Sequence, residues 1–200
     1  WATLCFTTKY HEIEKKTGTT ILKKNGITNS YKEFALSFLK HTNNQPISLE
    51  VLSDNSEKMI NEAIEISSWS DTIYVKIPII NTKGEYNTKV ITELNNLNIK
   101  QNITAIFTQE QVDHVFNLLK NTKIKNILSV FSGRIADTGI DPKILCKYAS
   151  NLLNKNNNLK LLWASTREVF NVFEALESGC DIITINEVIF KKLDLINKDL

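Results

Sequence analysis

From residue 47 onward, short apolar segments alternate with longer amphipathic ones, and this alternation restricts the fold more than any other feature of the sequence. The apolar segments are about six residues long, rich in branched side chains and bounded by turn-forming residues, as strands are. Between them, apolar residues recur at helical spacing over roughly 10 to 15 residues. Serial strand–helix units of these lengths predict a parallel sheet covered by helices.

The expected elements follow from this pattern, although the first 29 residues are harder to interpret. The expected strands are residues 47–52, 72–78, 99–107, 124–131, 159–164 and 181–185. The expected helices are residues 31–41, 57–67, 85–97, 109–120, 142–154, 167–176 and 186–193, with N-caps at Asp54, Thr108, Asp141 and Thr166. Residues 132–140 are expected to be a loop, and one or two short strands are expected before residue 30.

Two architectures fit serial strand–helix units, namely a closed (β/α)8 barrel and an open doubly wound sheet. No Gly-x-Gly-x-x-Gly sequence follows an expected strand, so nothing favours a dinucleotide site. Polar and aromatic side chains instead share one face of the strands and gather toward their C-terminal halves. These pairs are Ser48 and Glu50, Tyr74 and Lys76, Asn102 and Thr104, Ser129 and Phe131, and Trp163 and Ser165. Barrel active sites are built at that end of the strands, so the sequence predicts one α/β domain, a (β/α)8 TIM barrel over residues 1–200.

Composition excludes several classes of function. The 200 residues are 42% hydrophobic and 23% charged with a net charge of +2, which supplies no basic surface for nucleic acid. The longest apolar runs are strand-sized, so no membrane span is expected, and residues 1–10 do not resemble a signal peptide. The 3 cysteines and 3 histidines lack metal-ligand spacing, so we expect no metal and no cofactor, and a reducing, cytoplasmic compartment.

The expected strand at residues 72–78 carries a lysine, Lys76, on the face opposite its branched aliphatic side chains. An ammonium group is costly to bury, so this lysine extends to water, finds a charged partner or loses its proton. A neutral amine is a nucleophile for carbonyl carbon. Tyr74, Phe131 and Ile106 are expected to be the apolar neighbours that desolvate Lys76.

The groups expected around Lys76 suit iminium chemistry on a carbonyl sugar. The lysine attacks a ketone, and the protonated imine then draws electrons from a neighbouring C–C bond as that bond breaks or forms. Glu50, at another strand end, is expected to move the proton through a water held by Thr104.

Two arginines lie in the loops that follow the next strands, Arg134 and Arg167. Paired arginines with a serine hydroxyl form a clamp for an anion, and phosphate is the natural ligand. Each arginine can instead pair on the surface with Asp137 or Glu168. The sequence alone leaves both interpretations open.

Four motifs at these strand ends and loops are Tyr74–Pro78, Asn102–Thr104, Ser129–Ile135 and Trp163–Arg167. Together they resemble the transaldolase family, in the short single-barrel branch that includes the fructose-6-phosphate aldolases. The resemblance runs from about residue 28 to residue 200, with the motifs in the family's order. It implies a TIM barrel that forms a Schiff base with its substrate.

The resemblance also implies roles for the polar residues inside the barrel. Lys76 is the Schiff-base lysine, and Glu50 and Thr104 hold the catalytic water. Asn102 and Ser129 contact the bound sugar. No metal or cofactor takes part in this chemistry.

The implied substrates are sugar phosphates, whose phosphate is bound by Arg134, Ser165 and Arg167. Phe131 takes the place of a tyrosine that marks the aldolase members, and Glu50 the place of a glutamine. This combination implies transfer of a dihydroxyacetone unit between sugar phosphates. The resemblance also allows a homo-oligomer, with neither nucleic acid nor membrane as a partner.

The first 29 residues depart from the family pattern. The family's first strand ends in an acid/base aspartate, whereas no Asp precedes Asp54, and neither Thr7–Thr8 nor Thr19–Thr20 is followed by the family's Asn-Pro. The family also continues into a further helical segment near Leu200. We therefore expect an altered or incomplete first βα unit and C-terminal helix. Without the aspartate, C–C cleavage should slow by ~10²–10⁴-fold, which leaves three hypotheses: a transaldolase, an aldolase, or a catalytically impaired sugar-phosphate-binding barrel.

Overall fold

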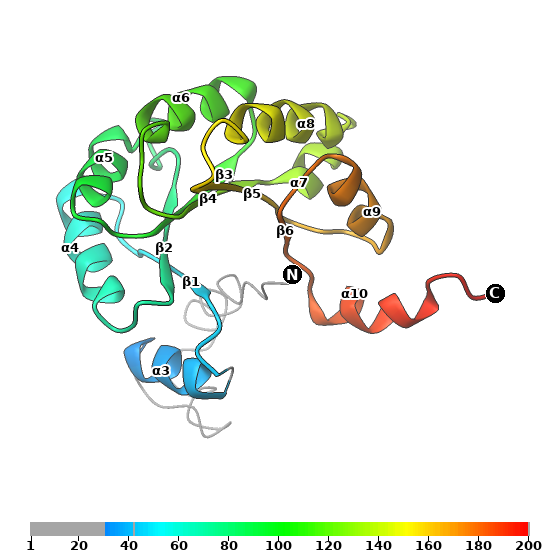
Figure 1. Ribbon diagram of the computed structural model, residues 1–200, viewed down its shortest axis with the longest axis horizontal. Helices are drawn as coiled ribbons and strands as arrows, with labels where there is room; N and C mark the ends of the chain where they lie inside the picture. Colours follow the sequence, from blue (N-terminus) through cyan, green and yellow to red (C-terminus); the bar gives the residue numbers. More distant parts are fainter. Residues whose placement is uncertain (1–30, 42, 200) are drawn as a thin grey trace.

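The computed structural model describes residues 31–41 and 43–199, in which six parallel strands curl into an incomplete TIM barrel (Figure 1). The strands lie side by side in chain order: β1 (Ile47–Glu50), β2 (Ile73–Pro78), β3 (Gln101–Ile106), β4 (Asn126–Val130), β5 (Leu159–Trp163) and β6 (Ile182–Ile183). The expected barrel class is confirmed for this part of the chain. The expectations for the first βα unit fall on residues 1–30, outside the described residues.

The helices of the described residues are α3 (Tyr31–His41), α4 (Ser56–Ser67), α5 (Thr88–Asn96), α6 (Gln109–Leu119), α7 (Ser132–Ala136), α8 (Pro142–Leu153), α9 (Phe170–Glu177) and α10 (Glu187–Lys192), followed by the 3₁₀ turn η1 (Leu193–Leu195). Of these, α4, α5, α6 and α8 cover the outer side of the curled sheet (Figure 1). Across residues 31–41 and 43–199, no helix is both long and apolar enough to cross a membrane.

Local hydrogen bonds explain where several helices begin. Thr108 caps α6 in a capping box with Gln111, as expected, and Asp141 caps α8 with proline at its first position. Asp54 was expected to cap α4, but Asn55 does so by accepting the N–H groups of Glu57 and Lys58. Asp54 instead accepts the backbone N–H of residue 82 at 2.9 Å.

Two expectations about the later loops are wrong. Thr166 does not cap α9, because its hydroxyl donates to the carbonyl of Thr184 and α9 begins only at Phe170. The expected loop at residues 132–140 contains the short helix α7. The backbone N–H of Ile135 donates to the carbonyl of Phe131 at 3.0 Å, which closes the first turn of α7.

The strands separate an outer core, which packs against the helices, from an inner face. Parallel register pairs Glu50 with Lys76 and Lys76 with Asn102, so these three side chains share the inner face. A smaller inner cluster contains the buried side chains of Ile127, Leu162 and Ala164, with Tyr74 and Phe131 packed against it.

Two side chains expected on the inner face belong to the outer core. Trp163 pairs with Val130 in the register and is fully buried among the outer-core residues, so Leu162 takes the inner position. Ile106 also pairs with Val130, because the register between β3 and β4 shifts at Ala105, which has φ +60°. The bulge turns Ile106 away from Lys76.

Candidate functional site

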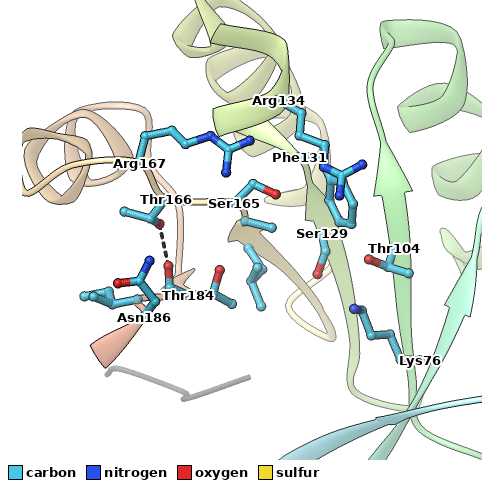
Figure 2. Close-up of a pocket in the computed structure, with 13 residues that line it drawn as sticks. Lys76, Thr104, Ser129, Phe131, Arg134, Ser165, Thr166, Arg167, Thr184 and Asn186 are labelled. Atoms are coloured by element: carbon cyan, nitrogen blue, oxygen red, sulfur yellow. Dashed lines mark hydrogen bonds between the residues drawn. The ribbon is translucent and has the colours of Figure 1, made fainter. Parts of the chain in front are cut away.

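A pocket of about 250 Å³ lies at the C-terminal ends of the strands (Figure 2). Its lining residues are Lys76, Thr104, Ser129, Phe131, Arg134, Leu162, Ala164, Ser165, Thr166, Arg167, Thr184, Ile185 and Asn186. The structure therefore brings together seven of the nine residues singled out from the sequence: Lys76, Thr104, Ser129, Phe131, Arg134, Ser165 and Arg167. Glu50 and Asn102 do not line the pocket, but both contact residues that do.

Lys76 projects from β2 toward the pocket and is only 6% exposed (Figure 2). Its Nζ lies 3.5 Å from Oε2 of Glu50 on the neighbouring strand β1, because the parallel register sets these two residues side by side. The backbone of Glu50 is held in turn by Tyr31, whose hydroxyl accepts the N–H of Glu50 at 2.9 Å and donates to its carbonyl at 3.3 Å. A residue on α3 thus fixes the strand end that carries the carboxylate.

A buried chain of hydrogen bonds runs beneath the pocket from β1 to β4. The Nδ2 of Asn102 donates to Oγ of Ser48 at 3.0 Å, and Oγ of Ser129 donates to Oδ1 of Asn102 at 2.6 Å. Asn102 is fully buried, so its contacts fix Ser129 at the pocket wall. This satisfied network locks the relative positions of three strands.

Thr104 lines the pocket next to this network, and no residue in the described part of the chain forms a hydrogen bond with its hydroxyl, although Thr104 is only 1% exposed. An unsatisfied buried hydroxyl costs about 1–3 kcal/mol, so such groups are uncommon unless a water or ligand completes them. The Oγ1 of Thr104 is therefore a ready hydrogen-bonding group for a bound molecule.

Arg134 enters the pocket from α7 and lies over an aromatic pair. Its guanidinium carbon is 5.4 Å from the centroid of the Phe131 ring, and that ring meets Phe107 edge-on with centroids 5.4 Å apart. Guanidinium groups stack favourably on aromatic faces, which restricts the orientation of Arg134.

Arg167 reaches the pocket from the loop after β5 and pairs with Asp137. Its Nε lies 3.2 Å from each carboxylate oxygen of Asp137, and its Nη2 lies 2.5 Å from Oδ2. The surface pairing that the sequence left open is thus present, and Arg167 nevertheless lines the pocket. The hydrogen bond from Arg167 and the nearby positive charges hold the pKa of Asp137 below its usual value.

Ser165 lies between the two arginines in the view of Figure 2. Strand parity alone would turn Ser165 outward, because Ala164 faces inward, but Ser165 has φ +63°. The carbonyl of Ser165 packs directly on Gly133 of α7, and the Gly133 N–H donates to the carbonyl of Ala164 at 3.2 Å. The loop that carries Arg167 and the helix that carries Arg134 are therefore fixed against each other.

Sequence reasoning missed the wall of the pocket formed by residues 184–186 and Thr166. Nothing in the strand pattern distinguished these residues, because β6 has only two residues and the loop after β5 departs from strand parity. The inner position of Leu162 and Ala164 was also missed. This inner position is determined by the register between β4 and β5, which cannot be derived from the sequence of either strand alone.

No cluster of three or more histidine, cysteine, aspartate or glutamate side chains that could hold a metal occurs in the described part of the chain. The charged groups that line the pocket are Lys76, Arg134 and Arg167, which are all basic. Such a pocket is suited to an anionic ligand.

Comparisons with known proteins agree with the motifs. Curated relatives include "Probable transaldolase 2" of Listeria monocytogenes, 35% identical over 150 residues, and "Probable transaldolase" of Thermoplasma volcanium, 32% identical over 177 residues. The first alignment covers 74% of this chain and 64% of the relative, and the second covers 88% and 74%. The chain thus matches a little under two thirds of the length of the Listeria relative.

The backbone is also similar to that of the PaMucR phosphodiesterase in complex with c-di-GMP. The TM-score is 0.51 with 12% identity, over 86% of this chain and 72% of that one. At this identity the similarity concerns the fold alone. The model of the transaldolase/fructose-6-phosphate aldolase family, however, matches residues 6–199 of the sequence. With the curated relatives, this match establishes that the chain belongs to the transaldolase/fructose-6-phosphate aldolase family.

Proposed function

We propose that the protein transfers a dihydroxyacetone unit between sugar phosphates through a Schiff base on Lys76. The observation that carries this proposal is the environment of Lys76: a buried amine at the pocket wall, a carboxylate 3.5 Å from it, and a buried hydroxyl in the same pocket that is bonded to none of the described residues. Burial keeps the amine among few competing waters, and Glu50 is positioned to accept its proton.

The proposed reaction begins when Nζ of Lys76 adds to the ketone carbon of the donor sugar. Water leaves as the C=O bond becomes a C=N bond, and the iminium accepts the electrons of the bond between its α and β carbons as that bond breaks. The hydroxyl on the β carbon gives its proton to a base and becomes the C=O of the departing aldehyde. The enamine that remains adds to an acceptor aldehyde, and water then restores the lysine and the new ketose.

Glu50 and Thr104 are the groups we assign to proton transfer. The Glu50 carboxylate lies beside the amine, and the Thr104 hydroxyl can hold a water between the two groups. Asn102 supports this arrangement by fixing Ser129, which is then able to bind a hydroxyl of the sugar.

The basic end of the pocket is assigned to the phosphate. Arg134 lines it from helix α7 and Arg167 from the loop between β5 and α9, which also carries the hydroxyl of Ser165. Arginine forks bind phosphate in a bidentate manner, so two of them select a phosphorylated sugar over a neutral one.

Transfer is favoured over simple cleavage by Phe131 and Glu50. Phe131, whose ring packs against Phe107 and Arg134, has no hydroxyl that could protonate the enamine and release free dihydroxyacetone. The enamine would therefore persist until an acceptor aldehyde arrives.

Reductive trapping tests the proposal. Incubation with fructose 6-phosphate and borohydride should give a covalent adduct on Lys76, identified by mass spectrometry of the peptide, and the Lys76→Met variant should give none. Transfer should require an added aldehyde acceptor, whereas net release of dihydroxyacetone without one would identify an aldolase. Binding of the sugar phosphate without any adduct would reduce the protein to a sugar-phosphate-binding barrel.

A further inference from the structure

We propose that Asp137 is a positioning residue that aims the guanidinium of Arg167 at the phosphate of the substrate. This inference rests on the proposed function, because it assumes that Arg167 binds phosphate. It assigns a task to a residue outside the lining of the pocket.

The geometry of the pair leaves half of the guanidinium available. Arg167 uses Nε and Nη2 to hold Asp137, which occupies one edge of the planar group. Arginine has five N–H donors, so the edge formed by Nη1 and the second hydrogen of Nη2 retains three of them. Arg167 lines the pocket, whereas Asp137 lies outside it. By holding the Nε edge of the guanidinium, Asp137 can therefore orient the opposite edge, which carries Nη1, toward a ligand in the pocket.

Asp137 is itself held in place by the helix that carries Arg134. It is the C-cap of α7, and its N–H donates to the carbonyl of Gly133 at 3.0 Å. Gly133 in turn contacts the loop of Arg167 through Ser165. Asp137 therefore connects the two arginines: it follows Arg134 at the end of α7, and it holds Arg167 through the ion pair.

The pair is too exposed to serve mainly as a stabilising contact. The side chains of Arg167 and Asp137 are 47% and 52% exposed, and exposed ion pairs typically contribute about 0–1 kcal/mol to stability. The hydrogen bond from Arg167 also lowers the pKa of Asp137, so the carboxylate stays ionised at neutral pH. Loss of the carboxylate should therefore alter ligand binding without unfolding the protein.

The test compares Asp137→Ala and Asp137→Asn with wild type, using calorimetric binding of fructose 6-phosphate and borohydride trapping with fructose 6-phosphate and with fructose. We expect Asp137→Ala to weaken fructose 6-phosphate binding about tenfold, as loss of one oriented charged contact does. Adduct yield at saturation and trapping with fructose should stay unchanged. Asp137→Asn, which keeps one acceptor for Nε, should fall between Asp137→Ala and wild type.

Two controls separate positioning from a general effect. Glu57→Ala removes a carboxylate from another exposed ion pair, with Lys89, and should leave binding unchanged. The double variant Asp137→Ala/Arg167→Ala should bind no more weakly than Arg167→Ala alone, since Asp137 acts through Arg167.

Several results would overturn the inference. These are unchanged binding of fructose 6-phosphate by Asp137→Ala, equal losses with fructose and fructose 6-phosphate, and additive losses in the double variant. A wild-type protein that binds fructose 6-phosphate in an Asp137-dependent manner but forms no adduct would refute the proposed function and leave the role of Asp137 standing. A wild-type protein that binds no sugar phosphate would refute both.

Discussion

Replacing Gly133 by alanine tests the contact that holds the two arginine-bearing segments together. A Cβ on Gly133 would lie 1.7 Å from the carbonyl oxygen of Ser165 and 2.7 Å from its carbonyl carbon. A relaxed carbon–oxygen contact is ~3.3 Å or longer, so α7 and the loop after β5 would have to separate by roughly 1.5 Å. The obstacle is backbone, which cannot swing aside as a side chain can.

The expected cost follows from this displacement. Overpacking usually costs about 1–3 kcal/mol, and here it would also stretch the hydrogen bond from the Gly133 N–H to Ala164, now 3.2 Å. We therefore expect about 3 kcal/mol, near the top of that range. For a domain of this size each kcal/mol lowers Tm by about 2–4 °C, so Gly133→Ala should melt roughly 6–12 °C below wild type.

Thermal unfolding and fructose 6-phosphate binding together provide the assay. Gly84→Ala is a matched control, because Gly84 has φ +80° and no atom of residues 31–41 or 43–199 lies within 4 Å of an added Cβ. Its backbone strain should cost about 1–2 kcal/mol without affecting binding. Gly133→Ala should lose both stability and affinity, since it displaces Ser165 and Arg167. A Gly133→Ala protein that melts within 2 °C of wild type and binds normally would refute this account of the contact.

Three further substitutions test the inner side of the pocket. Lys76→Met should still fold, but with a lower Tm, because it removes the amine that lies 3.5 Å from the Glu50 carboxylate and leaves that carboxylate without this partner. It should give no borohydride adduct, and turnover comparable to wild type would exclude Lys76 as the nucleophile. Thr104→Val should keep or raise Tm, because it removes a buried hydroxyl that is bonded to none of the described residues. It should slow turnover by about 10²-fold or more, and unchanged turnover would exclude a catalytic water held by Thr104. Tyr31→Phe removes the two hydrogen bonds between the Tyr31 hydroxyl and the backbone of Glu50, so the free energy of unfolding should fall by about 1–2 kcal/mol. Adduct formation should also slow, because these bonds hold the strand end that carries the Glu50 carboxylate. An unchanged Tm would contradict this role of Tyr31.

Strand parity predicted the inner face because it depends only on the period of two residues. Glu50, Lys76 and Asn102 occupy consecutive register positions on three strands, as their parity required. The six parallel strands and α3 (Tyr31–His41) were likewise evident from apolar spacing. These features are local, and each strand alone contains the information.

The parts that could not be predicted depend on contacts between segments. Trp163 was assigned to the inner face together with Ser165 because they lie two positions apart in the sequence, but the backbone turns at Ser165 and Trp163 belongs to the outer core. The cap of α4 differs by one residue because Asp54 finds a partner at residue 82, which lies beyond the next strand. The ion pair of Asp137 with Arg167 spans 30 residues, and the sequence offered Glu168 as an equal alternative.

The backbone itself marks the pocket. Among the described non-glycine residues with positive φ, four are asparagines: Asn43, Asn44, Asn98 and Asn197. Asparagine tolerates this conformation, whereas alanine and serine adopt it at a cost of about 1–2 kcal/mol. The other two are Ala105 and Ser165, one next to Thr104 and the other in the pocket wall. Strain of this kind persists only where the surrounding structure enforces it, and it gathers at functional sites. At both positions the strained residue changes which side chains face inward, so the backbone strain lowers the stability of the fold but determines the shape of this pocket.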